Sequence, residues 1–231
     1  MIKASALLGQ FQQAMAPRAE PSLTVLVLLE LVAVFLALPL EDLGLWPFAA
    51  RVILTIALFL IALVVVSQHR TSLVITVVAF TLAMISAIGR PHWRPTRIVY
   101  ADIVAQFCLV AVLSWVVGRA LFAPGRVTYH RIQGAIAVYL QLALLFQFAY
   151  LLVVVQSPNA FSPAIVLTES NSASKLLYFS LVTLTTTGYG DLVAIHPIAR
   201  SLANLEAVAG QLFPAILLAR LVTLELEHRR R

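Results

Sequence analysis

Six long apolar runs, separated by short polar segments, limit the folds open to this chain. They cover residues 23–40, 52–67, 72–88, 98–117, 132–155 and 198–226. A helix needs about 20 predominantly apolar residues to cross a bilayer. The chain is 61% hydrophobic and 11% charged, whereas soluble domains are about 45–50% apolar and about 25% charged. We therefore expect an all-α membrane protein with six transmembrane helices.

A seventh apolar stretch, from Ser174 to Leu184, has about half the length needed to cross. It follows a polar loop at 156–173 and leads directly into the sequence TTTGYGD. Non-helical backbone at membrane depth is tolerated only where protein shields it or where it lines a water-filled path. This order of segments predicts a re-entrant pore helix followed by a loop that lines a pore.

The residue types in this loop suit a backbone that binds cations. Gly188 and Gly190 alternate with larger residues, and glycine accepts backbone angles that other residues avoid. The alternation allows successive carbonyls to point toward one axis, and Thr186 adds a hydroxyl oxygen at one end. One chain supplies only one edge of such a cage, so several copies must surround the axis for the carbonyls to replace the water shell of an ion.

The pattern TxxTxGYGD at residues 183–191 resembles the signature of the potassium channel family. With six apolar runs around this motif, the chain is similar to bacterial potassium channel subunits of the six-transmembrane type. The resemblance implies a tetrameric pore in which K⁺ binds at Thr186, Thr187, Gly188 and Tyr189. Gly190 completes the implied selectivity filter. The residues implied to support the filter are Thr183, Tyr178, Phe179 and Asp191.

This copy of the motif departs from the common family pattern in its bracing residues. Tyr178 and Phe179 stand where many members have two tryptophans; the tyrosine keeps a donor that could reach Asp191, but the phenylalanine has none. Thr187 stands where valine is commonest, and Val182 where some bacterial members carry a glutamate that pairs with the aspartate. We expect a less rigidly braced filter, whose inactivation a Phe179→Trp substitution changes.

The last apolar run contains a possible gating element. Pro214 removes the helical hydrogen bond to the carbonyl of Gly210, and the glycine weakens the same turn. The pair predicts a bend that serves either as a gating hinge or as a static kink. Glu206 is a charged residue type inside a membrane helix, where such residues usually find partners. We expect it to accept or donate a hydrogen bond behind the filter, with an ion-facing role as the alternative.

The runs divide the chain into five parts. These are a cytoplasmic N-terminal segment (1–22), a four-helix transmembrane domain (23–117), a linker (118–131), a pore domain (132–226) and a basic tail (227–231). The four-helix domain occupies the position of a voltage sensor, but its fourth run carries no arginine series, which a sensor needs.

We therefore expect a potassium-selective channel subunit that conducts K⁺ passively and is not classically voltage-gated. Two alternatives stay open. One is a weakly voltage-dependent K⁺ channel, in which Arg97 pairs with Asp102 and Glu30 offers a further partner. The other is a non-conducting or modulatory subunit that assembles with another channel.

The formal net charge of +6 does not indicate nucleic acid, because no patch combines basic and aromatic residues. Basic residues lie near the ends of the apolar runs, with an excess on the side that carries both termini, which favours cytoplasmic termini. We expect a multi-pass plasma membrane protein whose partners are the lipid bilayer and three further copies of itself. No catalytic cluster is evident, so we expect neither an enzyme nor a cofactor, with K⁺ only as the permeant ion.

Overall fold

The computed structural model describes residues 19–37, 39–40, 43–45, 48–66, 73–78, 80–81, 96–122, 129–167 and 172–229. This part of the chain is mostly helical, as expected. Its helices are α2 (Ala19–Val32), the π-helical η2 (Ala33–Ala37), α4 (Phe48–Val66), α6 (Thr96–Phe122), α7 (Tyr129–Gln156), α8 (Ser172–Leu184) and α9 (Pro197–Arg229). Its strands are β1 (Phe161–Ser162) and β2 (Val193–Ala194).

Three of the described helices contain spans long and apolar enough to cross a membrane: Val99–Arg119, Tyr129–Gln156 and Pro197–Leu224. The chain is therefore a membrane protein. The runs at 23–40 and 52–67 form shorter apolar helices within the described residues. Most of the run at 72–88 lies outside the described residues, although residues 73–78 are helical. Six crossings thus stay a prediction.

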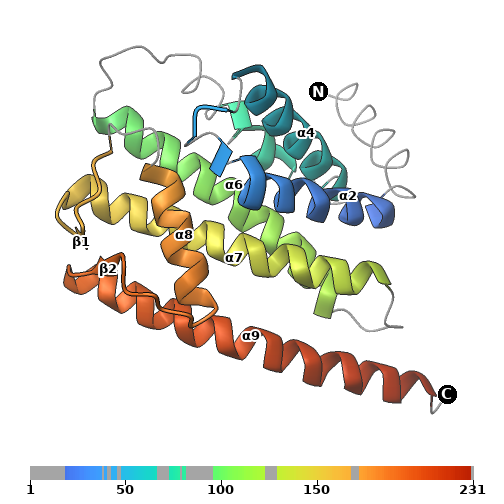
Figure 1. The fold of residues 1–231 in the computed structure, drawn as a ribbon. Coiled ribbons are helices and arrows are strands. Elements are labelled where there is room, and N and C mark those ends of the chain that lie inside the picture. Colours follow the sequence, from blue (N-terminus) through green and yellow to red (C-terminus); the bar gives the residue numbers. More distant parts are fainter. Residues whose placement is uncertain are drawn as a thin grey trace.

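Helix α7 lies in the middle of the fold and contacts α2, α6, α8 and α9. In Figure 1, α6 and α9 lie on opposite sides of α7, and α8 crosses α7 at a steep angle and ends beside α9. Small residues on α7 permit close contact on different faces. Ala137 is fully buried in a cluster with α2, α4 and α6, whereas Ala143 is fully buried against Leu177 and Leu184 of α8.

Polar side chains join α2, α6 and α7. Gln141 of α7 donates a hydrogen bond of 2.6 Å from Nε2 to Oε1 of the buried Glu30 in α2. The hydroxyl of Ser114 in α6 donates a bond of 2.9 Å to Gln141 Oε1. Lipid offers no such partners, so these groups face the bundle interior. Glu30, a candidate partner for an arginine in the sequence, is bonded here to a glutamine.

The segments on either side of the filter sequence are joined before α9 begins. Strands β1 and β2 pair in antiparallel register, with Phe161 opposite Ala194. The N–H groups of Ile195 and His196 both donate to the carbonyl of Ala160, at 2.9 and 3.1 Å. Helix α9 then continues for 33 residues without interruption at Pro214, a length of about 50 Å at about 1.5 Å per residue.

Candidate functional site

Helix α8 is the short helix that the apolar stretch from Ser174 to Leu184 predicts. Its 13 residues reach only about 20 Å, which is too short to cross. Beyond Leu184 the chain folds back onto the end of the helix. The N–H of Thr186 donates to the carbonyl of Thr183, and that of Thr187 to the carbonyl of Val182, both at 2.9 Å. These bonds satisfy carbonyls that the end of a helix otherwise leaves unpaired.

The loop after α8 has an alternating backbone. Positive φ angles occur at Thr186 (56°), Gly188 (60°) and Gly190 (80°), whereas Thr187 and Tyr189 have none. Glycine adopts such angles without steric cost. Thr186 is the non-glycine residue with positive φ in the described chain, and such a conformation persists only where the surroundings hold it. The local pattern therefore has the alternation that the sequence suggested.

The expected ion-binding residues all lie on the surface of the single chain. Residues 185–191 are exposed, and 71% of the Tyr189 side chain is accessible. Backbone polar groups in such a loop cannot face lipid, because nothing there satisfies them. At membrane depth, this surface must line water or be covered by protein.

Two aromatic residues of α8 make different contacts: Tyr178 packs against the loop, and Phe179 packs against the rest of the protein. The Tyr178 side chain interacts with Asp191, and its ring lies nearly parallel to that of Tyr189, with centroids 6.5 Å apart. Phe179 is buried and makes edge-to-face contacts of 5.1 Å with Tyr150 and Phe161. Phe179 thus braces α8 through ring packing, which is worth about 0.5–1.5 kcal/mol per pair beyond area burial.

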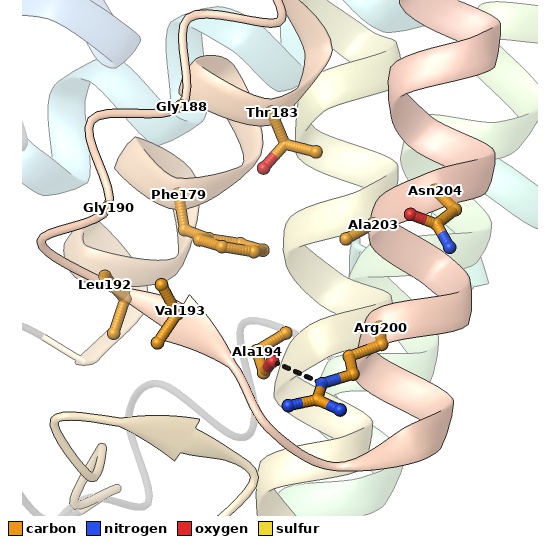
Figure 2. A pocket seen from close by; sticks show the side chains of 10 residues that line it. All are labelled: Phe179, Thr183, Gly188, Gly190, Leu192, Val193, Ala194, Arg200, Ala203 and Asn204. Atoms are coloured by element: carbon orange, nitrogen blue, oxygen red, sulfur yellow. Dashed lines mark hydrogen bonds between the residues drawn. The ribbon is translucent and has the colours of Figure 1, made fainter.

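A groove runs behind the loop, between α8 and the first turns of α9 (Figure 2). Thr183 faces it from α8, and Ala203 and Asn204 face it from α9. Arg200 Nε donates a bond of 3.1 Å to the carbonyl of Ala194, shown as a dashed line, which fixes β2 to the beginning of α9. The sequence-predicted support residues Thr183 and Phe179 therefore share one groove with the glycines of the loop.

Glu206 of α9 lies deep in the protein and is hydrogen-bonded to side chains of two other helices, α7 and α8. Its side chain is 0% exposed. The Tyr150 hydroxyl of α7 donates to Oε2 at 2.6 Å, and the Ser180 hydroxyl of α8 is hydrogen-bonded to Oε1. The expected hydrogen bonds of Glu206 to neighbouring helices are present, and its carboxyl group is buried within the described chain.

The hydrogen bonds of this cluster indicate whether Glu206 carries a proton. The Ser180 hydroxyl also lies 2.7 Å from the carbonyl oxygen of Ala143, yet it has only one hydrogen to donate. All contacts are satisfied together when Glu206 carries a proton and donates to Ser180, while Ser180 donates to Ala143. A neutral carboxyl group also avoids the cost of an isolated charge in an apolar interior.

Gly210 lies where α9 packs tightly against the end of α8. A Cβ atom there would lie 1.9 Å from the carbonyl oxygen and 2.8 Å from the carbonyl carbon of Leu184. The glycine is therefore required for close packing, independent of any hinge. The gating role of Gly210 and Pro214 stays a prediction.

Sequence reasoning missed several residues around the site. Gln147 donates from α7 to the carbonyl of Ala173 at 3.1 Å, and Gln211 of α9 donates from Nε2 to Thr186 Oγ1 at 3.0 Å. Like Tyr150 and Ser180, each is a polar side chain in an apolar helix. A polar residue within an apolar run is the sequence signal that could have identified them, because such groups usually find partners in the bundle.

Residues 138–226 match the model of a protein family described as Ion channel. The matched segment begins in α7, includes α8 and the loop, and ends in α9. It covers less than half of the chain. Comparisons with curated proteins and with solved structures gave no match. The segment is an ion channel pore domain, and the protein is not an enzyme.

Proposed function

We propose, from the ion channel domain at residues 138–226, that this protein is a potassium-selective channel subunit that conducts K⁺ passively. The observation that carries the proposal is the loop from Thr186 to Gly190, with positive φ at every second residue and a half-length helix before it. Potassium filters use rings of backbone carbonyls in place of the hydration shell. Thr186, Thr187, Gly188 and Tyr189 supply these oxygens in the proposal.

A homotetramer follows from the same chemistry, because a carbonyl cage for K⁺ takes four such loops. The surface of the single chain supports assembly. Helix α9 exposes a series of apolar side chains, among them Leu205, Val208, Leu212 and Ile216. The exposed loop backbone also needs water or protein beside it. Four α8 helices would direct their partly negative carboxyl ends toward the central axis and favour a cation there.

The proposal places the channel in the plasma membrane with cytoplasmic termini, on the distribution of basic residues. Helix α6 carries arginines only near its ends, at Arg97 and Arg119. A voltage sensor needs a series of arginines within the field of the membrane. The proposed channel is therefore not classically voltage-gated.

Potassium flux from liposomes that contain the purified protein tests the selectivity. We expect the protein to discharge a K⁺ gradient and to leave a matched Na⁺ gradient intact. Equal passage of Na⁺ would disprove potassium selectivity, and the absence of any flux would favour the modulatory alternative. Native mass measurement of the detergent complex should give about 100 kDa, four times the 25.2 kDa chain.

Gly190→Ala should reduce this flux at least tenfold. Alanine at φ +80° has open space around its Cβ but pays a backbone cost of about 1–2 kcal/mol in each subunit. The matched control is Gly118→Ala, since Gly118 lies in α6 and a Cβ there also meets nothing within 4 Å. Normal flux in Gly190→Ala would contradict the filter assignment.

A further inference from the structure

One hydrogen bond connects α9 to the first residue of the expected filter. Gln211 follows Gly210, the position at which α9 approaches the end of α8. From there its Nε2 donates a bond of 3.0 Å to Oγ1 of Thr186. The neighbouring threonines turn to each other instead, with Thr185 Oγ1 and Thr187 Oγ1 2.9 Å apart. Thr186 is thus the loop threonine that α9 holds.

The location of this bond distinguishes it from the buried contacts around Glu206. Both Gln211 and Thr186 are exposed in the single chain, on the surface that the proposed pore uses. An exposed neutral hydrogen bond adds little net stability, about 0.5–1.5 kcal/mol. Its main effect is to fix the directions of the Thr186 hydroxyl oxygen and the Gln211 amide oxygen. Thr186 also needs such support, because its positive φ is unfavourable for a threonine.

We propose that Gln211 positions the innermost ion-binding oxygens of the filter and helps to set which cations bind there. This inference rests on the proposed function. A threonine hydroxyl has one hydrogen and two acceptor lone pairs. When Gln211 donates to one lone pair, the hydroxyl hydrogen must point away from Gln211, and one lone pair is left for a cation. The amide oxygen of Gln211 is a second neutral acceptor beside it.

In four copies, the arrangement forms two adjacent rings of neutral oxygens, one from Thr186 hydroxyls and one from Gln211 amides. Hard cations prefer such oxygen ligands. The probe is Ba²⁺, which resembles K⁺ in size but carries twice the charge. Applied from the cytoplasmic side in bilayer recordings, it should block K⁺ current by binding at this inner end.

Gln211→Leu removes the N–H donor but keeps a side chain of similar size. It should weaken Ba²⁺ block about tenfold and lower the ratio of K⁺ to Na⁺ permeability. Gln211→Glu places a carboxylate beside the same site and should strengthen block at least tenfold. Gln106→Leu makes the same chemical change in α6 and should leave block unchanged. Block that is unchanged in both Gln211 variants would overturn the inference.

A double-mutant cycle separates positioning from general structure. If Gln211 acts through the Thr186 hydroxyl, Gln211→Leu should change Ba²⁺ block less than twofold in a Thr186→Ala background. The full tenfold effect should persist with Thr186→Ser, which keeps the hydroxyl. An additive effect in the alanine background would overturn the positioning role. Where Thr186→Ala does not conduct, the shift in melting temperature with Ba²⁺ gives the same comparison on purified protein.

The two levels of proposal fail in different ways. A wild-type protein that passes no K⁺ would remove the proposed function and this inference with it. A wild-type protein that conducts K⁺ selectively, with null results at Gln211, would remove the inference alone.

Discussion

Gly210→Ala should abolish most K⁺ flux and lower the melting temperature of the protein. The added Cβ would lie 1.9 Å from the carbonyl oxygen of Leu184. Because this neighbour is backbone, no change of rotamer relieves the clash, and α9 must move away from the end of α8. Overpacking of this kind costs about 1–3 kcal/mol in each subunit. Liposome flux and thermal unfolding in detergent measure the two effects.

The control for Gly210→Ala is Gly118→Ala, which adds the same methyl group to α6 in open space. This control should change neither flux nor melting temperature. The two measurements also separate packing from hinge motion. If Gly210 is a hinge without tight packing, Gly210→Ala should keep its thermal stability and have a reduced open probability. If Gly210 is needed for packing, the melting temperature and the flux should both fall. Normal flux and stability in Gly210→Ala would contradict both explanations.

Glu206→Leu should have the second largest effect. Leucine removes both carboxyl oxygens and leaves the Tyr150 hydroxyl without its acceptor at the junction of α7, α8 and α9. A buried polar group without a partner costs about 1–3 kcal/mol. We expect a clear drop in melting temperature and at least tenfold less K⁺ flux, since α8 leads directly into the proposed filter loop.

Glu206→Gln is the matched variant, because the amide is neutral and nearly the same shape. Its oxygen can accept from Tyr150 while its nitrogen donates to Ser180, the pattern that a protonated Glu206 makes. The K⁺ flux should stay within about twofold of wild type, and the melting temperature should stay near that of wild type. If glutamine were as damaging as leucine, the cluster would require a negative charge, and the neutral reading of Glu206 would be wrong.

The sequence was sufficient to predict the helical class, the half-length α8 and the loop after it. These follow from run length and glycine spacing, which are local properties. The need of Glu206 for a partner within the bundle also follows from the sequence, because a charged residue type in an apolar run needs one. The identity of the partners does not, since Tyr150 and Ser180 are 56 and 26 residues away in sequence. Only the packing of three helices brings them together.

Gly210 shows why residue type alone was ambiguous. A glycine in a membrane helix can provide conformational freedom or allow close approach of a neighbour, and the sequence pattern is the same in both cases. The contact with Leu184 supplies the second reason directly. Gln211 was missed for a related cause, because its bond to Thr186 exists only once that close approach is made.

The pairing of β1 with β2 has a mechanical consequence for the loop between them. The chain leaves α7, enters α8 and the filter loop, and returns to the same place, where Ala160 accepts hydrogen bonds from Ile195 and His196. A force that pulls α7 and α9 apart at this end therefore acts on the strand pairing as well as on the direct contacts between the two helices. The pairing closes the segment between Phe161 and Ala194 into a loop, so the strands carry part of such a force in place of the proposed filter.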